Sequence, residues 1–156
     1  MDLSGEDGDF YYEARREAWL DIHGAGIPFD GEGFLAAARR NLLDDPGAVV
    51  CAMLGSEPAG VLQLDPRRDA GAGAGYIPFV YMTPARRKQG LGVQLIGQAV
   101  SFYRPQGRTL LRLRCAPDNA VAQRFYKKYG FYKIGEEQGA RVPLDILEKY
   151  IGYDKT

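Results

Sequence analysis

One stretch decides the fold of this chain: Tyr81-Met82-Thr83-Pro84-Ala85-Arg86-Arg87-Lys88-Gln89-Gly90-Leu91-Gly92-Val93. It follows an apolar, strand-like run at residues 76–82 and opens an amphipathic, helix-like run at residues 91–103. A helix N-terminus offers unpaired N–H groups and a positive dipole end, and glycine lets a phosphate approach the backbone. Three consecutive cations beside two glycines therefore predict a pyrophosphate-binding loop. A basic, solvated strand-to-helix turn is the alternative.

Length and charge limit the classes of protein. A chain of 156 residues suits one domain that buries about 68–70% of its unfolded surface. Twenty cations balance twenty anions, and a zero net charge argues against nonspecific nucleic-acid binding, which favours a basic domain. A local basic patch is compatible with this balance.

The sequence shows neither a secretory signal nor a membrane span. Residues 1–9 are polar and acidic, and no apolar run approaches the ~20 residues that a transmembrane helix needs. Cys51 and Cys115 are too few for a disulfide scaffold, and no Cys/His cluster has zinc-binding spacing. We therefore expect a reducing, cytoplasmic setting and no metal.

Two helices and a hairpin are predicted first. Asp9 can cap a helix that ends at Gly24, and Asp30 can cap a second helix that stops at the turn of residues 44–47. Residues 48–54 and 59–64 then form a strand hairpin. The positions expected to face inward are Tyr11, Ala14, Ala18 and Ile22 in the first helix, and Phe34, Leu35, Ala38 and Leu42 in the second.

The strand at residues 76–82 contains Pro78, which cannot donate a ladder hydrogen bond. A bulge or local break is therefore predicted there. The glycine-rich run at residues 71–75 lacks the Gly-Lys-Ser/Thr ending of a phosphate loop and precedes a strand, so it predicts a hairpin loop.

Helix and strand patterns follow in turn. Residues 91–103 predict a helix with Leu91, Leu95, Tyr103 and either Ala99 or Ile96 inward, ended by residues 104–107. Residues 109–115 alternate as a strand buried on one face, with Leu111, Leu113 and Cys115 inward. A helix starts at Asn119 and stops before Gly130, and residues 131–136 predict a strand. Residues 142–151 fit a strand or a helix, and a strand is favoured.

Two motifs resemble those of one family. Arg87-x-x-Gly90-x-Gly92 resembles motif A of the GNAT N-acetyltransferase superfamily, and Asn119-x-x-Ala122-x-x-Phe125-Tyr126-x-x-Tyr129-Gly130-Phe131 resembles its motif B. The resemblance implies a single α/β (α+β) domain over residues 1–156. Its fold would be a mixed, mostly antiparallel sheet of about six to seven strands flanked by about four helices, in which a splayed strand pair forms the acetyl-CoA slot.

The resemblance implies an N-acetyltransferase that moves an acetyl group from acetyl-CoA to a primary amine in a ternary complex. Tyr126 would be the catalytic acid, because a phenol with a pKa of ~10 can protonate the departing thiolate. A core aromatic residue is the alternative. The implied cofactor-binding residues are Tyr81, Met82, Thr83, Arg86, Arg87, Lys88, Gln89, Gly90, Leu91, Gly92, Val93, Asn119, Phe125 and Tyr126.

Several roles stay open. Asn119 could bind the pantetheine arm, cap its helix, or do both. No carboxylate lies at residues 76–82, where many relatives carry the general base, so Asp65, Glu32, Asp21, His23, a water chain or no base are alternatives. A lone histidine at a helix end is more often a capping residue than a base, which applies to His23. Cys115 could carry an acyl group, but its surroundings in the sequence favour a small buried core residue.

The acceptor and the assembly are also open. The acceptor could be a small amine, an amino acid, a polyamine, an aminoglycoside or a protein amine. For a polycation, the scattered carboxylates are Asp21, Asp30, Glu32, Asp145 and Glu148. No membrane partner is expected, a homodimer is compatible with the sequence, and a noncatalytic acyl-CoA-binding or sensing module is the competing function.

Overall fold

The computed structural model describes residues 3–87, 89–139 and 142–152. Contacts divide the chain into two compact units, Met1–Pro66 with Phe79–Leu95 and Arg67–Pro78 with Ile96–Thr156. We call them unit 1 and unit 2. The single-domain organisation expected from the sequence stays a prediction. In the described residues, no helix combines the length and the apolar character needed to cross a bilayer.

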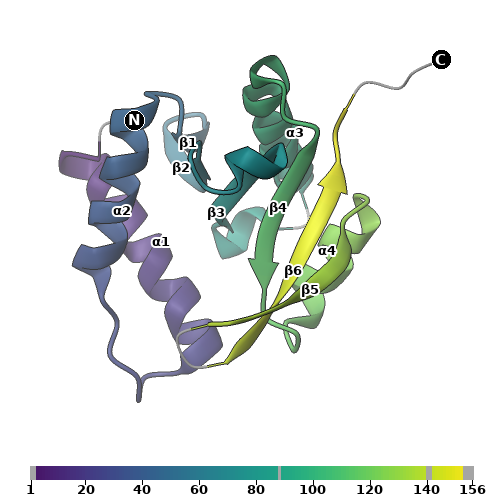
Figure 1. Ribbon diagram of the computed structural model, residues 1–156. Helices are drawn as coiled ribbons and strands as arrows, with labels where there is room; N and C mark the ends of the chain where they lie inside the picture. Colours follow the sequence, from purple (N-terminus) through teal and green to yellow (C-terminus); the bar gives the residue numbers. More distant parts are fainter. Residues whose placement is uncertain (1–2, 88, 140–141, 153–156) are drawn as a thin grey trace. The chain divides into compact units, whose positions relative to one another are not determined.

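Unit 1 begins with two helices that lie side by side, α1 (Gly5–His23) and α2 (Gly31–Asp44) (Figure 1). The predicted cap of α1 at Asp9 is wrong, because the helix begins earlier, at Gly5, with Ser4 in the cap position. Acidic side chains in the first turn favour this start electrostatically, and the buried Leu3 anchors it. Ile22 was expected to face inward, but 48% of it is exposed.

The second helix begins and ends as predicted. The Asp30 carboxylate accepts a 2.9 Å hydrogen bond from the Gly33 N–H, which is the arrangement of an N-cap. Leu35 and Ala38 are buried, and Phe34 and Leu42 pack against the same core. The core also takes Tyr11 and Ala14 from α1, which confirms those inward positions.

The remaining strands of unit 1 pack on these helices. β1 (Val49–Leu54) and β2 (Glu57–Asp65) form the predicted antiparallel hairpin. Within the core, the Gln63 side chain accepts hydrogen bonds from the Tyr11 hydroxyl at 2.7 Å and from Arg15 at 2.9 Å. The same amide donates to Asn41 at 2.8 Å. This buried polar cluster ties both helices to β2.

β3 (Ala74–Met82) is divided between the units, with residues 79–82 in unit 1 and residues 74–78 in unit 2. The local break predicted at Pro78 is wrong, because the strand continues through it. Proline removes one donor, but its fixed φ of about −65° is compatible with extended backbone. A bulge in the strand pairing stays a prediction.

Unit 2 carries the other strands. β4 (Leu110–Cys115) pairs in parallel with the first residues of β3 and antiparallel with β6 (Pro143–Tyr150), and β5 (Tyr132–Gln138) pairs antiparallel with β6. Residues 142–151 are therefore mainly strand, as favoured. In the described residues the hydrogen-bonded order of the six strands is β1-β2-β3-β4-β6-β5.

Two further helices contain parts of the two motif stretches. α3 (Leu91–Tyr103) has the predicted bounds, and Leu91, Leu95, Ile96, Ala99 and Tyr103 are all buried. α4 (Ala120–Lys128) lies beside β5 and β6 in unit 2 (Figure 1). Short 3₁₀ turns occupy Ala70–Ala72, Pro84–Arg86 and Arg104–Gln106. The glycine-rich run thus forms a turn and then enters β3, as predicted for a loop.

Candidate functional site

The predicted pyrophosphate loop connects β3 to α3 within unit 1. Its Gly90 has a φ of +83°, a conformation that favours glycine, and none of the described residues lies within 4 Å of the place where a Cβ would stand. The loop leads directly into the first turn of α3, a helix of 13 residues whose first N–H groups lack helical partners. A helix N-terminus favours an anion, and the lack of a Cβ at residue 90 lets a phosphate approach the backbone before it. Lys88 lies outside the described residues.

The end of β3 has a defined orientation. The Thr83 N–H donates to the Ala59 carbonyl at 2.9 Å, and the Tyr81 carbonyl lies against Gly60 of β2. Successive residues of a strand direct their main-chain groups to opposite edges, so the N–H and C=O of Met82 point away from β2. Of the three residues predicted to hold the pantetheine arm, Met82 thus offers its N–H, while its carbonyl accepts a bond from Arg87 and the Thr83 N–H is bonded to Ala59.

Two basic side chains of the loop, Arg86 and Arg87, contact other residues of unit 1. Arg86 pairs loosely with Glu57 at 3.6 Å. Arg87 donates from Nε to the Met82 carbonyl at 3.1 Å and from Nη2 to Glu17 at 3.0 Å. The Gln89 amide donates to the Ala85 carbonyl at 3.0 Å. None of these bonds involves the main-chain N–H groups that would face an anion.

Glu17 is a residue that the sequence reasoning missed. Besides Arg87, its carboxylate accepts a hydrogen bond from the Tyr81 hydroxyl. Glu17 follows Ala14 by three residues and Phe10 by seven, a spacing that places the three side chains along one side of α1. Since Ala14 is buried and Phe10 packs against the core, this spacing was the signal that could have found it.

The Tyr81 ring is buried between aromatic neighbours. It is 7% exposed, stacks on Phe79 with ring centres 6.0 Å apart, and meets Phe10 edge-on at 6.3 Å. Burial, reinforced by the hydrogen bond and charge of Glu17, raises the pKa of the Tyr81 phenol, and the positive charge of Arg87 opposes the rise. The phenol therefore stays protonated and donates to Glu17.

Unit 2 holds the residues of the second motif. The Asn119 side chain accepts a 3.2 Å hydrogen bond from the Ala122 N–H at the start of α4, so the predicted cap is present. Asn119 is exposed, which leaves its amide NH₂ accessible. Phe125 is partly buried and contacts Tyr129, with ring centres 5.0 Å apart.

Tyr126 is partly buried between Phe125 and Phe131, each 5.3 Å away between ring centres. Burial is the main cause that raises the pKa of its phenol, and Cys115 adds a smaller contribution. Within the described part of unit 2, the hydroxyl has no hydrogen-bond partner in the protein. A protonated, uncommitted phenol is chemically able to donate to an anion.

Cys115 is a buried thiol. Burial, followed by the negative charges of Asp145 and Asp118, raises the pKa of Cys115 to about 11. The thiol is therefore neutral near pH 7 and a weak nucleophile. This favours the core interpretation over an acyl carrier.

The other candidate bases and carboxylates differ in their surroundings. His23 ends α1 with its ring centre 4.1 Å from that of Trp19, and Asp21 and Glu32 are exposed. By contrast, Asp145 and Glu148 are buried and already paired. Asp145 accepts a bond from Gln123 at 3.1 Å, and Glu148 accepts one from Arg112 at 2.6 Å.

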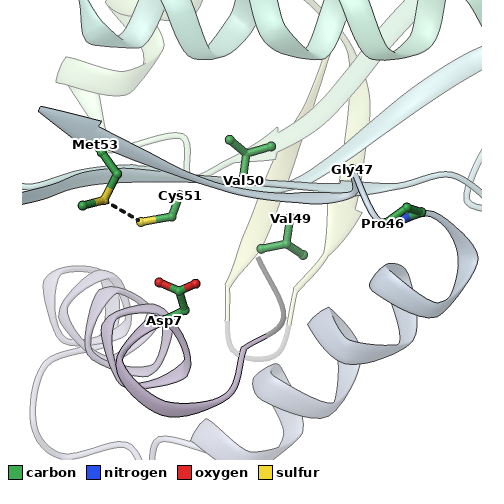
Figure 2. Close-up of a pocket in the computed structure, with 7 residues that line it drawn as sticks. All are labelled: Asp7, Pro46, Gly47, Val49, Val50, Cys51 and Met53. Atoms are coloured by element: carbon green, nitrogen blue, oxygen red, sulfur yellow. Dashed lines mark hydrogen bonds between the residues drawn. The ribbon is translucent and has the colours of Figure 1, made fainter. Parts of the chain in front are cut away.

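Each unit contains a surface hollow, and Asp145 and Gln123 line the one in unit 2. The one in unit 1 has a volume of about 320 Å³. It lies beside β1, where the thiol of Cys51 and the thioether of Met53 point toward one another and Asp7 of α1 faces them (Figure 2). The one in unit 2, about 350 Å³, lies between α4 and the β5–β6 pair. Neither includes a residue predicted to bind cofactor.

Solved structures share the fold. Ard1 from Thermoplasma volcanium is 18% identical with a TM-score of 0.74, covering 96% of this chain and 95% of that one. The PaiA N-acetyltransferase from Thermoplasma acidophilum in complex with coenzyme A is 21% identical with a TM-score of 0.71, covering 96% and 95%. YncA from Salmonella typhimurium with its cofactor acetyl-CoA is 18% identical with a TM-score of 0.70, covering 100% and 94%. These likenesses concern the fold.

Family membership comes from the sequence itself. No curated protein matches the chain. A model of the acetyltransferase (GNAT) family, however, matches residues 9–131, which include both motifs and most of the chain. The chain therefore belongs to the acetyltransferase (GNAT) family.

Proposed function

We propose that this protein is an acetyl-CoA-dependent N-acetyltransferase that acts through direct attack by an amine in a ternary complex. The observation that carries the proposal is the Gly90 loop, because its φ of +83° and the open space at its Cβ position fit a phosphate at the start of α3. Membership of the acetyltransferase (GNAT) family supplies the reaction class.

Acetyl-CoA would be held mainly by main-chain groups. The Arg87 N–H already donates to the Pro84 carbonyl at 3.4 Å, so the N–H groups of residues 89–93 would bind the pyrophosphate, and Arg86 or Lys88 would add positive charge. The Met82 N–H, which points away from β2, would donate to the thioester carbonyl and polarise it. Asn119 would bind the pantetheine arm through its amide NH₂ while its carbonyl oxygen keeps the helix cap.

Tyr126 would act as the general acid. The amine nitrogen bonds to the carbonyl carbon, the carbon–sulfur bond breaks, and the departing thiolate takes the phenol proton. The raised pKa keeps this phenol protonated at neutral pH, and its hydroxyl is free of other bonds in the described part of unit 2. The amine must attack in its neutral form, so an ammonium substrate would first lose a proton to water or to one of the candidate bases, Asp21, His23, Glu32 or Asp65. After attack, the extra proton on the amide nitrogen would return through water to the phenolate of Tyr126.

The experiment replaces one hydroxyl. Coenzyme A binding is measured by calorimetry, and thiol release from acetyl-CoA is measured with a panel of small, amino-acid, polyamine, aminoglycoside and peptide amines. Tyr126→Phe should lower kcat by about 10²-fold, the scale of general acid catalysis, with little change in coenzyme A affinity. Tyr129→Phe is the matched control on the neighbouring turn and should leave both quantities unchanged.

The alternative is a noncatalytic acyl-CoA-binding module. It predicts coenzyme A binding by the wild-type protein, no thiol release with any amine of the panel, and no effect of Tyr126→Phe. A protein that binds no coenzyme A would exclude both functions.

A further inference from the structure

The peptide unit between Met82 and Thr83 is held at both of its polar ends. Its carbonyl oxygen accepts the 3.1 Å bond from Arg87 Nε, and its N–H donates the 2.9 Å bond to the Ala59 carbonyl. One end is therefore fixed by the loop and the other by β2. The peptide can tilt only if one of these bonds breaks.

Arg87 is itself held by α1. Its Nη2 donates to Glu17 Oε1 at 3.0 Å, and the other oxygen of Glu17 accepts the bond from the Tyr81 hydroxyl. The Tyr81 ring belongs to the hydrophobic core of unit 1. Glu17 thus joins a core side chain to the guanidinium that holds the end of β3.

This use of Arg87 competes with its use as a phosphate ligand. A guanidinium recognises partners through a planar array of donors, and here Nε and Nη2 are both engaged by the protein. Arg86 is less restrained, because its contact with Glu57 is 3.6 Å long and 77% of the Glu57 side chain is exposed. Arg86 therefore suits the pyrophosphate better than Arg87 does.

The contribution of the Arg87–Glu17 pair is geometric. The side chains of Arg87 and Glu17 are 43% and 37% exposed, so solvent screens their charges and the ion pair adds little stability. Its effect is to fix the direction of the main chain next to Met82.

We propose that Arg87 and Glu17 are positioning residues that fix the main chain at the end of β3, so that the Met82 N–H is aimed at the acetyl-CoA carbonyl, and that Arg87 is not a pyrophosphate ligand. The proposal rests on the proposed function, since it names what aims the carbonyl-polarising donor. Its structural part, the restraint of the Met82–Thr83 peptide, applies to the protein without any cofactor.

The test separates the charge of Arg87 from its shape. Arg87→Lys keeps the positive charge but loses the planar pair of donors, Arg87→Gln loses both, and Glu17→Gln removes the anchor. Glu13→Gln is the matched control, because it breaks another exposed ion pair of α1, that with Arg16 at 3.6 Å, away from the loop. Three quantities are measured for each variant: hydrogen exchange of the Thr83 amide without cofactor, the Kd of coenzyme A, and kcat.

All three Arg87 and Glu17 variants should speed exchange of the Thr83 amide by about tenfold. They should also lower kcat by about tenfold through misalignment and change the Kd of coenzyme A by less than about threefold. The double variant Glu17→Gln/Arg87→Gln should be no worse than Arg87→Gln alone, because the two residues act as one unit. Glu13→Gln should match the wild type.

The opposite pattern would overturn the proposal. A weaker affinity for coenzyme A in Arg87→Gln that Arg87→Lys restores, with unchanged Thr83 exchange, would make Arg87 a charge partner of the pyrophosphate. If the wild-type protein binds no coenzyme A, the proposed function fails. Unchanged Thr83 exchange in the variants would then reject the positioning role independently, and accelerated exchange would support it.

Discussion

The carbonyl oxygen of Tyr81 lies so close to Gly60 that a Cβ on residue 60 would stand 2.6 Å from it. The side chains of Leu91 and Leu95, from α3, lie 3.4 and 3.5 Å from the position of this Cβ. The Tyr81 carbonyl and these two side chains therefore leave no room for a side chain on residue 60. The Tyr81 carbonyl belongs to the same peptide unit as the Met82 N–H. Gly60 therefore controls the direction of the donor that would polarise the thioester.

Gly60→Ala should displace this peptide unit. We expect a loss of about 1–3 kcal/mol in the free energy of unfolding, as for other overpacked sites, and a kcat lowered by at least about tenfold. Urea unfolding and steady-state rates measure the two effects. Gly97→Ala is the matched control in α3, where a Cβ meets no atom of the described residues within 4 Å, and it should be neutral or stabilising. Wild-type values for Gly60→Ala would contradict the close approach.

Gly90→Ala should weaken coenzyme A binding through backbone conformation. A Cβ there meets open space, so the cost comes from the φ of +83°, about 1–2 kcal/mol for a residue other than glycine. Because asparagine tolerates this conformation better than alanine, Gly90→Asn should bind coenzyme A more tightly than Gly90→Ala. Calorimetry compares the two, and equal affinities would show that backbone conformation is not the determinant.

The two roles of Asn119 can be separated by Asn119→Asp. Aspartate keeps an oxygen that accepts the Ala122 N–H, so stability should be retained, but it loses the amide donor and should weaken coenzyme A binding. Asn119→Ala should weaken binding as well and lose about 1 kcal/mol of stability with the cap. Thermal unfolding and calorimetry test this. Unchanged affinity in Asn119→Asp would leave the residue a cap alone.

Cys115 should make the protein less stable at alkaline pH. Its pKa rises from 9.0 to about 11 on folding, so between these values the unfolded thiol loses a proton that the folded one keeps. The contribution of Cys115 to the free energy of unfolding is therefore fully present below pH 9. Above pH 9 it falls with rising pH, by at most about 1.4 kcal/mol per pH unit. Urea unfolding across this range should show a steeper fall for the wild type than for Cys115→Ala, and parallel curves would refute the assignment.

Local signals allowed much of the fold to be predicted. The bounds of α3, Leu91–Tyr103, follow from its periodic apolar face, the glycines before it and the Arg104-Pro105 stop after it. Asn119 and Asp30 were recognised as caps because the side chain of each can accept a hydrogen bond from the main-chain N–H three residues later. Each of these signals is contained within a few residues of the element that it defines.

Features that depend on distant residues could not be predicted. Glu17 and Arg87 are 70 positions apart, and nothing in either segment specifies the other. The early start of α1 depends on Leu3, whose burial is decided by the packed core rather than by its neighbours in sequence. Likewise, Pro78 predicted a bulge or a local break from its missing donor, whereas β3 runs from Ala74 to Met82 and lies between β2 and β4 in the sheet.

Calorimetric titration of the purified protein with acetyl-CoA tests the central claim, that the loop before α3 binds the pyrophosphate of this cosubstrate. We expect saturable one-to-one binding that inorganic pyrophosphate competes with and that Gly90→Ala weakens. Absence of binding at millimolar acetyl-CoA, or binding that neither pyrophosphate nor Gly90→Ala affects, would contradict the account.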